Sequence, residues 1–126
     1  MREIKFRAWN GERMRHPSEF WISADGTPAA YNSDGNFRFV GWKLMQYTGL
    51  KDKNGVEIYE GDIVQSSFGI PPIRVRARVY FEDGCFSINT KDADPNITTL
   101  IHFMDCLNDE VEVIGNIYEN PELLER

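Results

Sequence analysis

Three arginines at every second position, Arg74, Arg76 and Arg78, are the residues whose type and spacing best suit a chemical role in this chain. Alternate residues of a β-strand point to the same face, about 6.5 Å apart, so the three guanidinium groups would form a row. Such a row can bind phosphates or a carboxylate-rich surface. We interpret it as a candidate anion-binding or nucleic-acid face. The more ordinary interpretation is cross-strand pairing with acidic neighbours, which is worth little per exposed pair.

Aromatic residues could assist such a face. Tyr80, Phe86 and Trp42 offer rings on which a single nucleic-acid strand could stack. Aromatic residues at strand spacing more commonly form a core, however. The chain also has 14 basic against 20 acidic residues, net −6, which disfavours binding to phosphate backbones and to anionic membranes. Nucleic-acid binding is therefore the alternative hypothesis, with salt-dependent binding to single strands as its signature.

The histidines and cysteines do not have the spacing of a metal site. Neither His16 nor His102 forms a C-x-x-C or H-x-x-x-H pattern with Cys85 or Cys106, so no zinc site is predicted. The apolar neighbours of both cysteines predict buried free thiols, and a disulfide is the minority interpretation. The low cysteine count, the absence of an apolar signal segment and the absence of a long apolar run together predict a protein of the reducing cytoplasm.

The acidic side chains predict no active site. Asp52, Glu57 and Asp62 could act as paired carboxylates, but ordinary turn acids of a hairpin explain them more simply. Residues 92–96 alternate oxygen ligands as a calcium loop does, yet they lack the glycine and the distal glutamate of an EF-hand. The glycines form no phosphate loop, and no serine has the context of a nucleophile. We therefore predict no enzymatic activity and no cofactor, and keep a reaction only as a remote third hypothesis.

A mainly β fold is expected to position these side chains, and its strongest signals lie in residues 44–64. Gly49 is placed where a strand would end, and Asn54-Gly55 predicts a tight turn between two strands that reach Tyr59. Gly61 can adopt a positive φ without cost and would reverse the chain before a third strand. This stretch therefore predicts architecture rather than chemistry.

A second antiparallel pair is predicted from Arg74 to Glu82 and from Cys85 to Asn89, with Asp83-Gly84 as its turn. Its core side would be formed by alternate residues of the first strand, namely Val75, Ala77, Val79 and Phe81. Residues 67–73 contain two prolines without an amide donor and are predicted to form a loop.

The remaining segments are assigned from turn residues and from alternation. Arg2 to Trp9 and Glu110 to Tyr118 predict strands, the second with a bulge at Gly115. Residues 12–42 predict two short hairpins or an extended loop, and 97–107 a strand or a short helix. The end of the chain predicts one helical turn over 121–125, capped by Asn120.

Together these elements predict one domain over residues 1–126. Its expected fold is mainly β, a small, partly open SH3-like β-barrel with additional N-terminal strands and hairpins and minimal helix, limited to the short C-terminal turn. A chain of this length can bury one core, so a second independent domain is not expected.

Charge is distributed unevenly along the chain. Residues 1–16 hold five basic and two acidic side chains, whereas residues 105–126 hold seven acidic and one basic. The two ends could be neighbours within one fold, or they could meet between subunits, where opposite charges steer association. Under the second interpretation the candidate interface residues are Arg7, Trp9, Tyr47, Tyr59 and Tyr118.

Three blocks of this sequence resemble the YopX family of phage and prophage proteins. They are RAWN at 7–10, LMQYTGLKDKNGVEIYEGDIV at 44–64 and VIGNIYENPELL at 113–124. Because the blocks lie in the family's order and near both ends, the resemblance covers essentially the whole chain, while 12–42 and 65–108 contribute nothing to it. It implies a small, mostly β protein with a barrel-like part and no established activity or catalytic residue.

We therefore predict a non-enzymatic, phage- or prophage-encoded protein-association module that forms a homo-oligomer in the cytoplasm of its bacterial host. A host or phage protein is a further partner under this hypothesis. No membrane association is expected.

Overall fold

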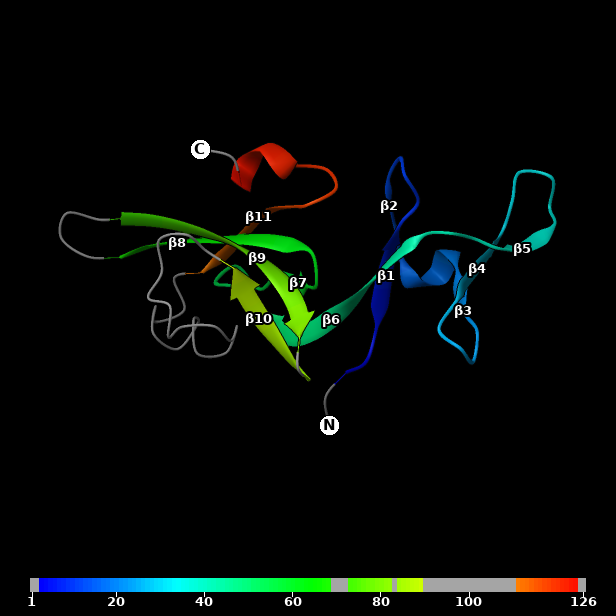
Figure 1. Ribbon diagram of the computed structural model, residues 1–126, viewed down its shortest axis with the longest axis horizontal. Helices are drawn as coiled ribbons and strands as arrows, with labels where there is room; N and C mark the ends of the chain where they lie inside the picture. Colours follow the sequence, from blue (N-terminus) through cyan, green and yellow to red (C-terminus); the bar gives the residue numbers. More distant parts are fainter. Residues whose placement is uncertain (1–2, 69–72, 83, 90–110, 125–126) are drawn as a thin grey trace. The chain divides into compact units, whose positions relative to one another are not determined.

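The computed structural model describes residues 3–68, 73–82, 84–89 and 111–124, and this part of the chain is built mainly from strands (Figure 1). The strands are β1 (Phe6–Trp9), β2 (Met14–Arg15), β3 (Trp21–Ile22), β4 (Pro28–Tyr31), β5 (Phe37–Phe39), β6 (Lys43–Lys51), β7 (Glu57–Tyr59), β8 (Asp62–Phe68), β9 (Ile73–Glu82), β10 (Cys85–Asn89) and β11 (Glu112–Asn116). In the described residues the helical elements are two 3-10 turns, η1 (Pro17–Glu19) and η2 (Pro121–Leu124). The predicted mainly β fold with minimal helix is confirmed.

The chain groups into two compact units, Met1–Tyr47 and Thr48–Arg126, and each is described by itself. The boundary between the two units falls inside β6. The prediction of one domain over residues 1–126 stays a prediction, because two compact units can also belong to one domain.

The first unit contains two sets of antiparallel strands. β1 pairs with β2 and with the first residues of β6. The amides of Glu12 and Arg13 both donate to Asn10 Oδ1 at 2.8 Å, which fixes the predicted turn after β1. The strands β3, β4 and β5 form a separate three-stranded sheet in that order.

Both short hairpins predicted within residues 12–42 are confirmed. The β3–β4 connection turns at Asp25-Gly26 and the β4–β5 connection at Asp34-Gly35, where Gly26 and Gly35 have φ of 90° and 80°. Only glycine adopts this backbone region without strain, so the turn residues decide where the strands of this sheet begin and end.

The core of the first unit is small. One buried cluster consists of Ala8, Phe20 and Ala30. Partly buried apolar side chains pack around them, namely Phe6, Val40, Trp42 and Leu44. Ala29, Met45 and Tyr47 are buried as well. Phe20 and Trp42 meet edge-on with ring centroids 6.1 Å apart, and the Arg15 guanidinium lies 5.0 Å from the Trp42 ring centroid. Aromatic and cation–π contacts therefore supplement a core that has few aliphatic side chains.

The second unit contains a curled, half-barrel sheet of antiparallel strands in the order β10-β9-β8-β11. The predicted hairpin at Asn54-Gly55 is confirmed, because β7 follows β6 in one sheet around this turn. The predicted pair from Arg74 to Glu82 and from Cys85 to Asn89 is confirmed as β9 and β10. The SH3-like barrel topology stays a prediction.

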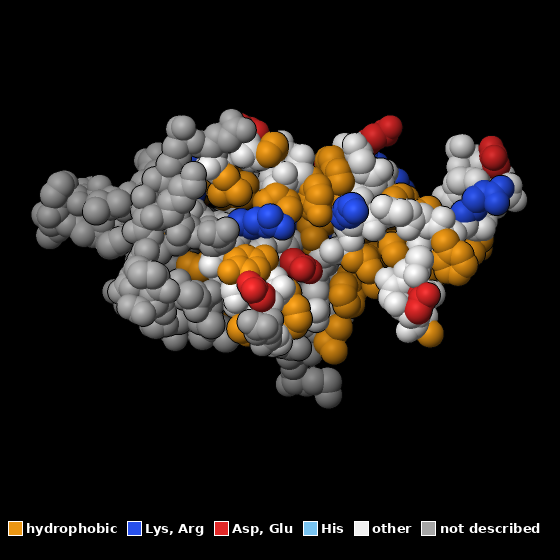
Figure 2. All heavy atoms as spheres, viewed as in Figure 1, with side chains coloured by type: hydrophobic (Ala, Val, Ile, Leu, Met, Phe, Trp, Pro, Cys, Tyr) orange, Lys and Arg blue, Asp and Glu red, His pale blue; other side chains and the backbone are white. Residues whose placement is uncertain are grey.

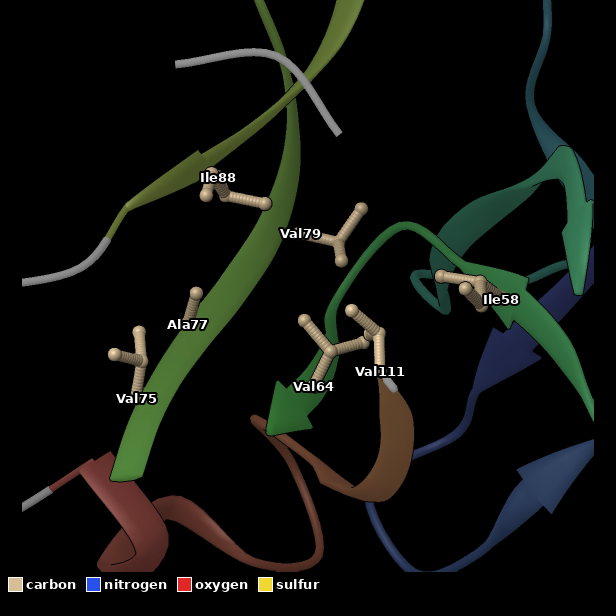
Figure 3. Packing of buried hydrophobic residues seen from close by; sticks show 7 residues of the cluster. All are labelled: Ile58, Val64, Val75, Ala77, Val79, Ile88 and Val111. Atoms are coloured by element: carbon tan, nitrogen blue, oxygen red, sulfur yellow. The ribbon is translucent and has the colours of Figure 1, made fainter. Parts of the chain in front are cut away.

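The core of the second unit lies on one face of this sheet (Figure 3). Its buried side chains are Ile58, Val64, Val75, Ala77, Val79, Ile88 and Val111. The predicted alternation of β9 is confirmed for Val75, Ala77 and Val79. Phe81 departs from it, since it lies near the hairpin end and is 50% exposed. Its ring packs instead on its cross-strand neighbour Phe86, with centroids 5.2 Å apart.

Two predicted strand ends are wrong. β6 continues through Gly49 to Lys51, because the glycine takes φ of 86° inside the strand rather than ending it. The loop predicted over 67–73 is also too long, since β8 reaches Phe68 and β9 begins at Ile73. The two prolines that predicted the loop lie outside the described residues.

The predicted bulge, chain reversal and short helical turn are confirmed, whereas capping of that turn by Asn120 stays a prediction. The strand predicted over 110–118 is seen as β11, Glu112–Asn116, and residue 110 lies outside the described residues. The register between β11 and β8 shifts between Val113 and Gly115, which is the predicted bulge. Gly61 has φ of 88°, as its predicted role in chain reversal requires. A short 3-10 turn, η2, follows Asn120, whose N–H donates to the Asn116 carbonyl at 2.9 Å. The segment predicted over 97–107 lies outside the described residues.

Candidate functional site

The sheet β3-β4-β5 presents four aromatic side chains on one face. Residues directly opposite each other in antiparallel strands share a face, and so do alternate residues of one strand. Trp21 pairs with Ala29 and Ala29 with Phe39, while Tyr31 pairs with Phe37. These five positions therefore lie on the same side of the sheet, and we call them the aromatic face. In Figure 2 hydrophobic side chains lie open at the surface in the region of these strands.

The aromatic rings of this face are exposed, although such rings are usually buried. Trp21 and Phe37 are each 50% exposed, Tyr31 61% and Phe39 68%. Trp21, Tyr31 and Phe37 touch one another, with ring centroids 5.4 to 5.7 Å apart in tilted or edge-on geometry. The three rings therefore form a preformed cluster, and Phe39 projects beside it from β5.

The opposite side of the sheet explains why this face is open. Ala30 points away from the aromatic face and is buried in the core of the first unit. The sheet thus uses one side for packing and leaves the other to the solvent, as antiparallel sheets can. The open side carries aromatic rings where a solvated face would normally carry polar side chains.

Two tight turns hold the strands of the aromatic face in register. In the β3–β4 turn, the Ser23 amide donates to the Thr27 carbonyl, and the Ser23 hydroxyl donates to the Asp25 carboxylate. The Thr27 amide also donates to Asp25 Oδ1, at 3.0 Å. The Ser23 hydroxyl, with further donors from Thr27, lowers the pKa of Asp25 to about 2. In the β4–β5 turn, Asn32 Oδ1 accepts the amides of Asp34 and Asn36, each at 3.0 Å.

Three basic side chains of the N-terminal segment are paired with carboxylates inside their own unit. Arg13 and Arg15 bind the Glu19 carboxylate at 3.1 and 2.5 Å, and Lys5 binds Glu3 at 3.3 Å. The His16 amide, with Arg15 and Arg13, lowers the pKa of Glu19. These pairs reduce the attraction that the basic end could exert on an acidic end of another copy.

The predicted arginine row is only partly open. Arg76 is half-buried, and its Nε donates to Gln65 Oε1 at 2.9 Å while its Nη1 donates to the Leu123 carbonyl at 3.3 Å. Arg78 is exposed, and the side chain of Arg74 lies outside the described residues. Arg76 therefore holds η2 against the sheet. The rings proposed to assist, Tyr80, Phe86 and Trp42, are half-buried.

The five predicted interface residues are distributed over both units. Arg7, Trp9 and Tyr47 belong to the first unit, and Tyr59 and Tyr118 to the second. Tyr47 and Tyr59 are buried and the other three are half-buried. They offer less open surface than the aromatic face does.

The acidic residues Asp52 and Asp62 are structural, as the turn interpretation predicts. Asp52 Oδ1 accepts the amides of Asn54 and Val56 at 2.8 and 2.9 Å, and its Oδ2 accepts the amide of Val113 at 2.9 Å. Asp62 is buried and accepts the Tyr59 amide at 2.7 Å. Both carboxylates are thus bonded to backbone.

The predicted burial of both thiols is wrong for Cys85, which is a free but exposed thiol at the hairpin end of β10. Cys106, His102 and residues 92–96 lie outside the described residues. Within the described part of the chain, no three His, Cys, Asp or Glu side chains gather as metal ligands. No helix of those residues is long and apolar enough to cross a membrane.

The aromatic face was not predicted, although its residues flank the predicted turns. Tyr31 and Phe37 lie next to the β4–β5 turn, and Trp21 lies in β3, which leads into the β3–β4 turn. Once the hairpin registers are fixed, all three fall on one side. Pairing the strands around Asp25-Gly26 and Asp34-Gly35 would therefore have grouped the rings, without showing that they are exposed.

Comparison with known proteins agrees with this fold. The family model described as YopX protein matches residues 5–125. A crystal structure of protein EF1440 from Enterococcus faecalis is 31% identical, with a TM-score of 0.64, and the match covers 99% of this chain and 100% of that one. An X-ray structure of protein yopX from Bacillus subtilis is 26% identical, with a TM-score of 0.65 and the same coverage. No curated protein matches the chain.

Proposed function

This chain belongs to the YopX family, and from that premise we propose that it is a non-enzymatic, phage- or prophage-encoded module that forms a homo-oligomer in the cytoplasm of its bacterial host. The observation that carries the proposal is the aromatic face of the sheet β3-β4-β5. The solved relatives come from bacteria, which supports a bacterial cell as the setting.

The size of the aromatic face suits a specific interface. An aromatic side chain has about 150–250 Å² of surface, so four rings at these exposures leave about 450 Å² of apolar area open. A standard interface buries about 800 Å² on each partner, of which about 57% is apolar. The face therefore supplies the apolar area of one such interface.

The chemistry of the face suits a second copy of the same chain. A two-fold interface brings a surface against itself, so each charged residue on it would approach its own like charge. None of the five positions of the aromatic face is charged. Two copies can therefore pack face to face without like-charge repulsion, and the rings gain further edge-on contacts.

Light scattering over a concentration series tests this function. We expect the wild-type chain to form an oligomer at high micromolar concentration, and Trp21→Ser and Phe39→Ser to raise the dissociation midpoint by about tenfold or more. Phe81→Ser is the matched control, because Phe81 is as exposed as Trp21 but lies in the second unit.

Circular dichroism must show that each variant is folded. A wild-type chain that stays monomeric at high micromolar concentration would overturn the proposal. So would a Phe81 variant that weakens association as much as the two variants of the aromatic face. Salt-dependent binding of a single-stranded oligonucleotide, lost in Arg78→Glu, would favour the nucleic-acid alternative instead.

A further inference from the structure

β5 is the terminal strand of its sheet in the described part of the chain. It pairs with β4 through Tyr31↔Phe37, Ala30↔Arg38 and Ala29↔Phe39, and no described strand pairs with its other edge. All three of its residues are exposed. An open strand edge of this kind is a template for pairing with another extended segment.

The hydrogen bonds around β5 show which of its backbone groups face outward. The Val40 amide donates to the Pro28 carbonyl at 2.9 Å, and the Asn32 amide donates to the Asn36 carbonyl at 2.9 Å. Backbone groups of an antiparallel strand alternate in direction, so Arg38 also faces β4. The N–H and C=O groups of Phe37 and Phe39 therefore point away from the sheet.

The side chains of β5 indicate what an added strand would carry. Phe37 and Phe39 lie on the aromatic face, whereas Arg38 lies on the other side. Arg38 is exposed, and no described carboxylate lies within ion-pair distance of it. Cross-strand neighbours contact each other directly, so a strand with an acidic residue between two apolar residues complements all three.

A second β5 is a poorer occupant of this edge. An antiparallel pair centred on Arg38 would oppose two guanidinium groups, which is destabilising. A pair centred on Phe37 would require an extended Gly35, which instead has φ of 80° in the turn. Of these three antiparallel registers only the one centred on Phe39 remains, so a second β5 has fewer ways to pair with this edge than a foreign segment has.

Two segments of the described strands have an apolar–acidic–apolar pattern, at 56–58 and 111–113, and neither is free to serve this edge in a second copy. In the first, Ile58 is buried in the core of the second unit. In the second, the outer edge is already bonded. The Lys53 amide donates to the Val111 carbonyl at 3.0 Å, and the Val113 amide donates to Asp52 Oδ2 at 2.9 Å.

From this geometry we infer that the outer edge of β5 binds an extended segment of another protein by strand addition, and that the segment alternates apolar and acidic residues. The N–H and C=O groups of Phe37 and Phe39 pair with the segment's backbone. Its acidic residue lies opposite Arg38, and its apolar residues extend the aromatic face. This site is separate from self-association, which uses the face rather than the edge of the sheet.

Calorimetric titration with two synthetic peptides tests the inference. The peptides are TVTVEVTV and TVTVKVTV, which differ only in the central charge. We use the full wild-type chain at a concentration below its dissociation midpoint, so that self-association does not compete. We expect the glutamate peptide to bind about five- to tenfold more tightly than the lysine peptide, and Arg38→Glu to reverse this preference.

A backbone variant separates strand addition from simple charge attraction. Phe39→Pro removes an outward N–H without removing a hydrogen bond to β4, whereas Phe39→Ala removes the ring and keeps the N–H. We expect the proline variant to bind the glutamate peptide about tenfold more weakly than the alanine variant does.

Several outcomes would overturn the inference. They are no binding of either peptide, an unchanged preference in Arg38→Glu, and equal affinity of the two Phe39 variants. Self-association that is abolished by Phe39→Pro but not by Phe39→Ala, with no peptide bound, would assign the edge to a second β5 instead. These results are independent of whether Trp21→Ser weakens the homo-oligomer, so the inference and the proposed function can fail separately.

Discussion

At Gly115, in the second unit, an added side chain would collide with a neighbour. A Cβ at this position would lie 2.5 Å from Asn120 Oδ1, the acceptor of the Asn116 amide. We expect Gly115→Ala to lower the free energy of unfolding by about 1–3 kcal/mol, because Asn120 must move and its hydrogen bond is strained. Urea unfolding measures this. Gly41→Ala is the control, since nothing lies within 4 Å of a Cβ there, and an equal loss in it would contradict the explanation.

Asp52 connects two parts of the second unit through one carboxylate. Its oxygens accept three backbone amides, two in the β6–β7 turn and one in β11. We expect Asp52→Ala to cost about 2–4 kcal/mol of unfolding free energy, because three donors in a mostly buried site lose their partner. Asp34→Ala, at an exposed turn position, should cost little. The same cost in both variants would show that Asp52 is an ordinary turn acid.

Asp25 gives a pH-dependent signature in the first unit. Its pKa is lowered to about 2 by the Ser23 hydroxyl and by Thr27, so the ionised form is favoured in the folded state. The resulting stabilisation is present above the ordinary pKa of about 3.8 and is lost as the pH falls through about 2. Titration followed by nuclear magnetic resonance should show the low pKa in the wild type. Ser23→Ala should raise the pKa of Asp25. An unchanged pKa in this variant would show that the Ser23 hydroxyl is not the main cause of the low value.

At the scale of elements, η2 depends on one side chain of β9. Arg76 donates to the Leu123 carbonyl, while Arg78 on the same strand is exposed. We expect Arg76→Met to speed hydrogen exchange at the amides of η2 by about tenfold, because the turn loses a bond that holds it to the sheet. Arg78→Met is the matched control and should leave that exchange unchanged. Equal effects of both substitutions would assign the change to general destabilisation.

Turn chemistry is the part of this fold that sequence predicts best, because it is local. Asn54-Gly55, Asp25-Gly26 and Asp34-Gly35 each place glycine where the backbone needs it, and all three hairpins form. Strand ends are less local. β6 continues through Gly49 although its pairing with β1 ends at Gln46, because a glycine can turn within a strand as well as after one.

The aromatic face could not be read from composition, because an exposed ring and a core ring have the same sequence pattern. Tyr31 lies between a small and a polar residue, and Val75 lies between two polar ones, yet Val75 is buried and Tyr31 is exposed. The difference depends on which side of each sheet faces the core, and that is a tertiary property. The arginine row shows the converse, since its alternation was predicted but the bonding of Arg76 to η2 was not.

At the scale of the whole molecule, the two units differ in charge. Met1–Tyr47 holds seven basic and five acidic residues, net +2, and Thr48–Arg126 holds seven basic and fifteen acidic, net −8. Copies could therefore associate through attraction between their oppositely charged units or through the uncharged aromatic face. The dependence of association on salt concentration distinguishes these two modes. We expect a tenfold increase in salt to change the dissociation midpoint by less than about threefold, because apolar contacts are barely screened. A much weaker oligomer at high salt would indicate charged ends instead.

The position of Arg38 has a consequence for keeping this protein in solution. The outer edge of β5 offers the outward backbone groups of two phenylalanines, a combination that recruits strands indiscriminately and leads to aggregates. Arg38 is the one charge in that strand, and it acts as a gatekeeper that admits an acidic segment and repels its own copies. The charge at this single position would therefore decide whether the edge binds a partner strand or causes the chain to precipitate.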